Sequence, residues 1–266
     1  MPYKEVNVNE VIFSLYIHSY PKHNGIQNVL LPVGYRTIPC NLQCFLGMHF
    51  LFERFSNVKG FTYQEVLLSF SVMLLEFSLA ECIARGFDRF PNLVRKGEFD
   101  RILVRPRNEI LQVLGSQFEL SRLGRMLQAV IIFVYAAQSG TIEWNFLKIL
   151  TLIFMLIGGF FLFSGLFMIY ATLSFFTLEG LEFMNIFTDG GREFGRYPVG
   201  VYGKWLLRFC TYIIPYALVQ YYPLLYLIGR NDNVCLVFVP LLTVLFLLPC
   251  YLLWKFGVRK YQSSGS

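Results

Sequence analysis

The hydrophobic residues of this 266-residue chain gather in long runs that short polar stretches separate. A helix that crosses a bilayer core about 30 Å thick needs roughly 20 apolar residues. The runs predict six membrane-spanning helices, at about 29–53, 61–84, 120–137, 146–176, 205–228 and 234–256. The expected fold is an all-α, polytopic membrane protein that forms a single domain over residues 1–266.

Two of these runs depart from a simple spanning helix. The run at 146–176 is longer than one perpendicular helix requires, which favours a tilt. It also contains Gly158 and Gly159, which favour a bend or a close helix contact. The run at 205–228 is interrupted by Pro215 and Pro223.

A polar, glycine-rich island at 177–208 separates these two runs. Its glycines permit turns and a close approach of the backbone, and Pro198 prevents a helix from running straight through. Its arginines and Lys204 fall between two apolar runs, as is typical of the cytoplasmic face of a membrane. We expect a membrane-surface elbow formed by Gly191, Arg192, Glu193, Gly195, Arg196, Tyr197 and Pro198.

Composition supports the membrane assignment. Hydrophobic residues make up 55% of the chain, charged residues only 15%, and the mean hydropathy is +0.51. A soluble domain carries about 25% charged residues. The net charge of +6 lies in loops that flank apolar runs, so it indicates membrane topology and anionic lipids as partners, and no nucleic acid. The six cysteines form no CxxC pair, so no metal site is expected.

The basic residues also predict an orientation. They concentrate in the 85–125 loop, in the island and in the C-terminal tail, whereas the opposite turns hold only Arg54, Lys59, Lys148 and Arg230. The side richer in lysine and arginine faces the cytoplasm. Six spans then place both termini in the cytoplasm.

The 86–118 loop mixes aromatic residues with charges of both signs, and Ile110, Leu111 and Leu114 recur at helical spacing. A segment of this kind suits docking into a groove on a soluble protein. It suits equally a helix that lies on lipid headgroups. The residues alone leave both interpretations open.

Two acidic residues, Glu76 and Glu81, fall inside the second apolar run. Buried charge in a membrane is costly, so one interpretation is an intramembrane proton or substrate site. The other is that Glu81 lies near the interface and pairs with Arg85 one turn later, while Glu76 bonds a neighbouring helix. The tyrosines of the fifth run either line a path for an amphipathic substrate or serve as packing and interface residues.

The sequence offers no catalytic residues. It contains no Walker A motif, and no GxSxG or HExxH. We therefore expect a protein that is not an enzyme and that takes any energy it uses from a partner or an ion gradient.

Two long stretches resemble a known family. They are GEFDRILVRPRNEILQVLGSQFELSRLGRMLQA at 97–129 and the segment of 177–230 that contains GREFGRYP and KW. Over about 45–266 the chain resembles the membrane subunit of bacterial ABC-2-type transporters, in the subfamily with FDR–LVRPRN and GREFGRYP motifs. Family members open with an amphipathic helix and a first span containing a Tyr-Arg pair. Here only Tyr35 and Arg36 correspond to that pair.

The resemblance implies a type V exporter-like permease with six helices, located in the bacterial cytoplasmic membrane. It implies a homodimer or heterodimer of permeases, served by cytosolic ATPase subunits that bind ATP and magnesium. The loop at 86–105 would be the coupling helix, contacting the ATPase through Phe90, Arg95, Phe99, Asp100 and Arg101. Phe99 and Arg101 would face that partner. The region of Pro223 and 229–233 would lie near the outer gate, and the cargo would be an exported lipid, peptide or drug-like molecule.

Two alternatives remain. The chain could be a stand-alone channel or a secondary carrier that uses Glu76 and Glu81. It could also be a degenerate membrane scaffold that transports nothing.

Overall fold

The computed structural model describes residues 47–52, 54, 57–117, 122–138, 142–177 and 181–262, the side chain of Leu181 excepted. The described residues form helices, turns and one isolated bridge between Val58 and Phe61. The predicted first span at 29–53 lies outside the described residues, except for a short helical piece at 47–52.

Three helical stretches of the described chain are long and apolar enough to cross a membrane. They are Tyr63–Arg95, Phe146–Leu173 and Cys235–Lys260, and they fall at the predicted second, fourth and sixth spans. At the predicted third span lies a shorter apolar helix, α7 (Leu123–Gln138). The described residues therefore support a membrane protein with at least these long helices and leave the count of six open.

The predicted fifth span is not one helix. The chain forms α10 (Lys204–Tyr212), α11 (Tyr216–Val219) and α12 (Tyr221–Leu227) in its place. Pro215 lies between α10 and α11, where its ring and missing N–H interrupt helical hydrogen bonding. The interruption that the sequence predicts at Pro215 is present, whereas Pro223 lies inside α12.

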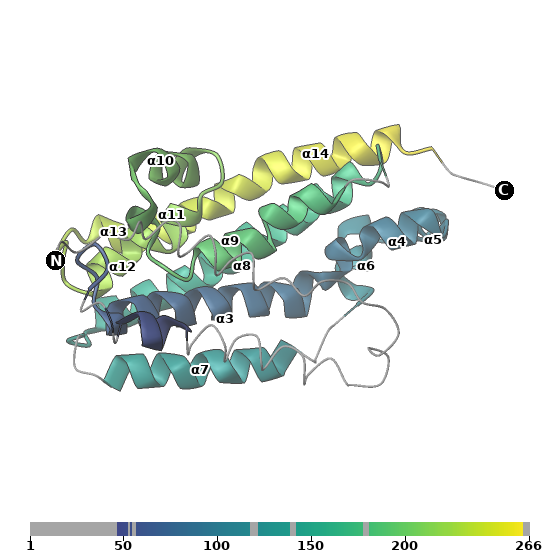
Figure 1. The fold of residues 1–266 in the computed structure, drawn as a ribbon. Helices are drawn as coiled ribbons and strands as arrows, with labels where there is room; N and C mark the ends of the chain where they lie inside the picture. Colours follow the sequence, from purple (N-terminus) through teal and green to yellow (C-terminus); the bar gives the residue numbers. More distant parts are fainter. Residues whose placement is uncertain are drawn as a thin grey trace, which may run out of the picture.

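Helix α3 (Tyr63–Asp88) is the central element, and α7 and α8 (Phe146–Leu173) pack along it (Figure 1). A capping box starts α3: the Thr62 N–H donates to Glu65, and the Glu65 N–H donates to the Thr62 hydroxyl. The last stretch, α13 (Cys235–Phe238), η4 (Val239–Phe246) and α14 (Leu247–Lys260), packs on α8.

Helices α3 and α8 run side by side in the same direction. Val72 packs with Met155, and the Phe77 and Phe163 rings meet edge-on with centroids 5.0 Å apart. Gly159 allows this approach, and the adjacent Gly158 allows η4 to approach α8. A Cβ on Gly159 would lie 2.4 Å from the Glu76 carboxyl carbon, and one on Gly158 would lie 2.6 Å from the Pro240 carbonyl oxygen. The prediction that these glycines permit close helix contacts is confirmed.

The glycine-rich island does not form a turn beyond the ends of the helices. It comprises η2 (Leu181–Ile186), α9 (Asp189–Phe194) and η3 (Val199–Tyr202), and it runs back along α3. Its Gly195 lies on the Met73 side chain, and the Lys59 Nζ donates to the Val201 carbonyl oxygen at 2.5 Å. The island therefore lies beside the apolar helix α3 and does not project beyond the helix ends, as the predicted elbow would.

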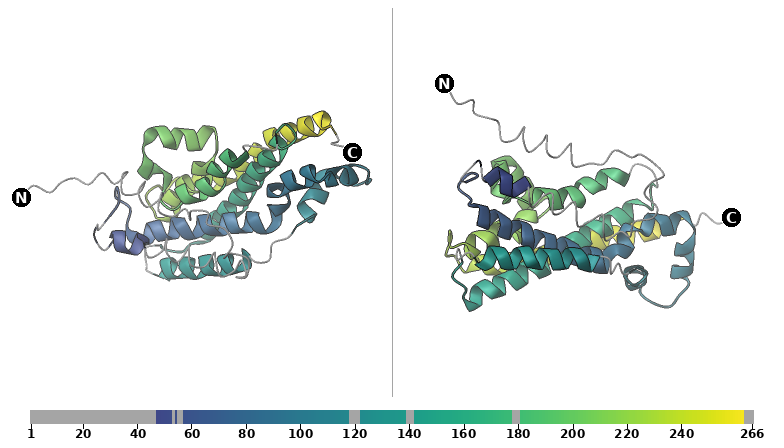
Figure 2. Two further views of the ribbon diagram at one scale, coloured as in Figure 1. Left: turned by 45° about the vertical axis from the view of Figure 1, so that its right-hand side comes forward. Right: turned by 60° about the horizontal axis from the view of Figure 1, so that its bottom comes forward.

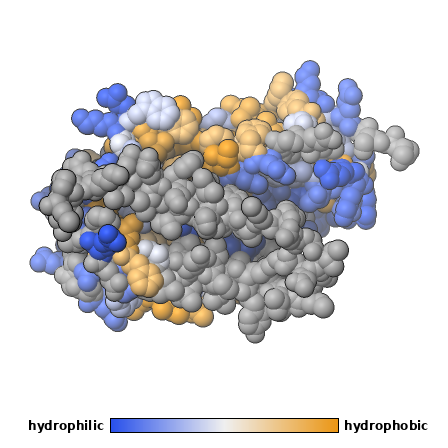
Figure 3. Space-filling model, viewed as in Figure 1, coloured by the Kyte–Doolittle hydropathy of each residue, from blue (hydrophilic) through white to orange (hydrophobic). Residues whose placement is uncertain are grey.

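The two ends of the bundle differ. At the start of α3, Arg230 donates to the Gly60 carbonyl and forms an ion pair of 2.7 Å with Glu65. Helix α10 lies at this end, so Lys204 does not join the basic loop as the sequence suggested (Figure 1 and Figure 2). The other end holds the short helices α4 (Phe90–Arg95), α5 (Glu98–Leu103) and α6 (Glu109–Gly115) together with the end of α14 (Figure 1). On the face shown in Figure 3, hydrophobic side chains lie along the upper edge and hydrophilic ones gather toward the ends.

Candidate functional site

The loop after α3 folds into three short helices. They are α4 (Phe90–Arg95), α5 (Glu98–Leu103) and α6 (Glu109–Gly115). Gly97 separates the first two with a φ of 68°, which a residue with a side chain rarely adopts. The Asn108 side chain accepts from the Ile110 N–H at 2.9 Å and begins α6. The prediction of helical spacing at 110–114 is confirmed.

An aromatic clamp attaches these helices to the long ones. We give this name to the rings of Phe90, Phe99, Phe175, Trp254 and Tyr261. The Phe90 centroid lies 4.9 Å from that of Phe99 and 5.0 Å from that of Trp254, and the Phe99 and Tyr261 centroids are 5.1 Å apart. These are edge-to-face contacts, which aromatic rings favour. The clamp joins α4 and α5 to the ends of α8 and α14.

An ion pair adds a second attachment. The Lys255 Nζ on α14 donates to Glu109 Oε1 on α6 at 2.7 Å. This hydrogen bond lowers the pKa of the Glu109 carboxyl below its ordinary value of 4.5. The short helices are therefore tied to α14 by apolar and by ionic contacts.

The predicted coupling residues divide into two groups. Phe90 and Phe99 are completely buried in the clamp, so the expectation that Phe99 faces a partner is wrong for this structure. Arg95 and Arg101 are exposed and Asp100 is half-buried. Beyond them lies an exposed tip, residues 101–107, in which Val104 is 85% accessible. The tip is therefore an exposed surface, and the phenylalanines support it from inside.

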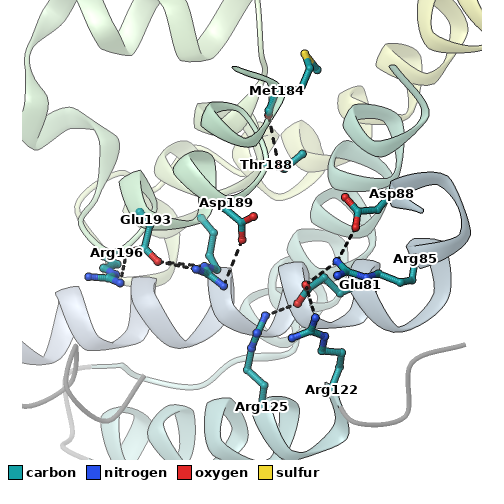
Figure 4. Close-up of polar contacts among 11 residues, drawn as sticks. Glu81, Arg85, Asp88, Arg122, Arg125, Met184, Thr188, Asp189, Glu193 and Arg196 are labelled. Carbon is teal, nitrogen blue, oxygen red and sulfur yellow. Dashed lines mark hydrogen bonds and ion pairs between the residues drawn. The ribbon is translucent and has the colours of Figure 1, made fainter. Parts of the chain in front are cut away.

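A charged cluster lies at the C-terminal half of α3, centred on Glu81 (Figure 4). Its Oε1 lies 3.2 Å from Arg85 Nη1 and 3.4 Å from Arg122 Nη2, and its Oε2 forms an ion pair with Arg125. Arg85 also pairs with Asp88 at 2.8 Å. The predicted Glu81–Arg85 pair is confirmed, and Arg122 and Arg125 fix α7 against α3 in the same cluster.

The island carries a second set of charges, which pair with one another (Figure 4). Arg192 lies 2.8 Å from Glu193 and 3.7 Å from Asp189, and Arg196 pairs with Glu193. The Arg192 guanidinium also lies over the Phe77 ring of α3, 4.9 Å from its centroid. Two acidic and two basic side chains cancel, which explains how this polar segment can lie along an apolar helix.

Of the other predicted elbow residues, the glycines provide close contacts. A Cβ on Gly191 would lie 2.1 Å from the Tyr216 hydroxyl oxygen, and one on Gly195 would lie 2.2 Å from Met73 Cε. Tyr197 is buried against α3, and Pro198 precedes η3. The elbow residues thus form a packed strip between α3 and α11.

Gln220, which the sequence did not single out, joins this strip to α3. It is fully buried between α11 and α12, and its Nε2 donates to Ser69 Oγ at 2.6 Å and to the Gly195 carbonyl. Its Oε1 accepts no hydrogen bond from the described residues.

Glu76 lies in the middle of α3 and is fully buried against Gly159. Neither carboxyl oxygen has a hydrogen-bond partner within the described part of the chain. The expectation that Glu76 bonds a neighbouring helix is therefore not met. The two acids of α3 differ: Glu81 is neutralised by arginines, and Glu76 pairs with no described cation.

Comparison with known proteins places the chain in a family. A family profile described as ABC-2 family transporter protein matches residues 40–265, which is most of the chain. Neither the curated proteins nor the solved structures that were searched gave a match. With its long apolar helices and this match, the chain belongs to the ABC-2 family of membrane transporter proteins.

Proposed function

We propose that this chain is the permease subunit of an ATP-binding-cassette exporter and works with a separate cytosolic ATPase. The family match supports the permease role and implies an ATPase partner in general. A second permease copy, or a homologous permease, completes the path across a bacterial cytoplasmic membrane. ATP and magnesium bind in the ATPase, and the chain itself performs no hydrolysis.

The observation that carries the proposal is the attachment of α4–α6 to the long helices. The aromatic clamp and the Glu109–Lys255 pair join the exposed tip to α8 and α14. Packed interiors transmit displacement because they have few voids and low compressibility. A push on the tip by an ATPase would therefore tilt α14 and α8 together.

In this proposal the end with α4–α6 and both termini face the cytosol. The basic residues at and around the tip, such as Arg101 and Arg105, agree with that orientation. The turn around Arg230 and the start of α3 then lie at the outer side, near the exit of the path. A lipid, peptide or drug-like substrate suits the apolar lining that such a path would have.

Co-purification and reconstitution test the proposal. The chain is expressed with the P-loop ATPase encoded beside it, purified, and placed in liposomes. We expect a stoichiometric complex whose ATP hydrolysis depends on the chain. A chain that binds no ATPase, and whose presence leaves ATP hydrolysis unchanged, would contradict the proposal and favour a non-transporting scaffold.

A stand-alone secondary carrier is the second candidate, and the unpaired carboxyl of Glu76 is the observation that favours it. Glu81 does not favour it, because three arginines neutralise its charge. Transport by the purified chain alone under a proton gradient, abolished in Glu76→Gln, would establish the carrier and exclude the ATPase-driven exporter.

A further inference from the structure

Glu76 is a buried acid that the packing of the bundle leaves without a counter-charge. Its side chain is fully buried between α3 and α8, and no described residue donates to either oxygen. An isolated carboxylate in an apolar interior costs far more than its neutral acid, so such groups bind a proton or a cation. In the packing seen here, the carboxyl lies directly on Gly159.

Two guanidiniums in this part of the bundle already have partners. The guanidiniums of Arg192 and Arg125 lie over the ring of the adjacent Phe77, at 4.9 Å and 5.9 Å from its centroid. Arg192 pairs with Asp189 and Glu193, and Arg125 pairs with Glu81. On the α8 side, Glu76 meets the backbone of Gly159, which carries no charge.

A second buried acceptor lies on the same side of α3. Ser69 is seven residues before Glu76, which is two helical turns or about 10 Å along the axis. Its hydroxyl accepts from Gln220, whose Oε1 has no partner among the described residues. Two acceptors without a described donor therefore lie at this face of α3, the Glu76 carboxyl and the Oε1 of Gln220. Such a face suits a ligand that brings positive charge or donors of its own.

We propose that Glu76 is the binding site for a cationic group on the transported molecule, such as a quaternary or primary ammonium. In the closed packing of α3 on α8 a proton neutralises the carboxyl. When α8 moves away from α3, the cation of the substrate takes the place of that proton, which leaves to water. The site therefore selects amphipathic cations over neutral molecules of equal length. This inference rests on the proposed transport function, because it requires α3 and α8 to separate during a cycle.

Carbodiimide labelling of the full chain in detergent tests the site without any ATPase. Dicyclohexylcarbodiimide reacts with protonated carboxyls in apolar surroundings, and peptide mass spectrometry identifies the modified residue. We expect labelling at Glu76 and none at Glu81, whose carboxylate pairs with three arginines. The competing probe is decyltrimethylammonium, and the matched neutral control is decanol.

Decyltrimethylammonium at ten times its dissociation constant should slow the labelling of Glu76 by about tenfold. Decanol at the same concentration should leave the rate unchanged. Equal protection by both probes, or by neither, would overturn the assignment, and so would an absence of labelling at Glu76. Binding of radiolabelled decyltrimethylammonium should also be lost in Glu76→Gln and kept in Glu98→Gln, a change on the exposed surface. Labelling and cation binding at Glu76 are measured without an ATPase. They can therefore fail while the ATPase-dependent function is observed, and they can succeed while that function is absent.

Discussion

The Lys255 ammonium on the last helix lies 2.7 Å from the Glu109 carboxylate on α6. This ion pair joins the loop that follows the second predicted span to the end of the sixth predicted span. The aromatic clamp does the same with apolar contacts. The loop is therefore part of the helical bundle, and its tip is exposed.

The first prediction concerns the interior of the clamp. Phe99→Ala removes a fully buried ring and should lower the free energy of unfolding by about 3–5 kcal/mol. Phe176→Ala is the matched control: its ring is 54% exposed at the end of α8, and the loss should stay within about 0.5 kcal/mol. Denaturant unfolding of both variants in detergent measures the difference. Equal losses would contradict the burial of Phe99.

The second prediction concerns the exposed tip. Arg101→Ala combined with Val104→Asp should leave the unfolding midpoint unchanged, because both side chains are exposed. The same pair should lower ATPase stimulation in the reconstituted complex, because it changes the surface that a partner contacts. If the double variant stimulates ATP hydrolysis as strongly as the native chain does, the tip is not the surface that contacts the ATPase.

The third prediction concerns the charged cluster. Glu81→Gln leaves Arg122 and Arg125 buried without their carboxylate, and breaking a buried ion pair typically costs about 3–5 kcal/mol. The unfolding free energy should fall by an amount of this order. The control, Glu98→Gln, alters an exposed acid and should be nearly neutral. A similar small effect for both would mean that the cluster contributes little to stability.

The fourth prediction concerns pH. Glu109 has a depressed pKa in the folded chain, so its ion pair stabilises the fold in full above the ordinary, unfolded pKa of 4.5. This contribution should disappear as the pH falls through the folded, lower pKa. The difference in unfolding midpoint between the native chain and Glu109→Gln should be present in full at pH 7 and should disappear as the pH falls below the folded pKa of Glu109. A difference that does not change with pH would contradict the role of the Lys255 pair.

The fifth prediction separates the two adjacent glycines of α8. Gly158→Ala places a Cβ against the Pro240 carbonyl, a backbone atom that cannot swing away, so α8 and η4 must part. Gly159→Ala meets the Glu76 side chain, and Glu76→Ala should partly rescue it. Gly124→Ala on α7 has open space and is the control. Unfolding midpoints should fall most for Gly158→Ala, and a rescue of Gly158→Ala by Glu76→Ala would contradict this packing.

Whether the sequence predicts a contact depends on how far apart along the chain the contacting residues lie. The Glu81–Arg85 pair follows from helical spacing alone, and it is present. The additional partners Arg122 and Arg125 require α7 to pack on α3, which no local pattern encodes. The burial of Phe99 could not be predicted for the same reason. Its alternation with charges suggests an amphipathic surface, but the rings that bury it, Phe175 and Trp254, lie far along the chain.

The island shows a different limit. Its glycines predict close backbone approach, and Gly191 and Gly195 do make such contacts. Its arginines suggest a position at the membrane surface. The positive-inside rule counts basic residues and does not consider the acidic residues that pair with them. In the structure Arg192 and Arg196 pair with acids of the same segment, so the island can lie along α3.

The central claim is that an ATPase acts on this chain through the tip at 101–107, and site-specific crosslinking tests it most directly. Single cysteines are placed at Val104 on the tip and at Trp205 on α10, both exposed, in a chain whose native cysteines are replaced by alanine. We predict a crosslink between Val104→Cys and the ATPase subunit, and none from Trp205→Cys. A crosslink from Trp205→Cys alone, or labelling of Val104→Cys from outside intact cells, would contradict the account.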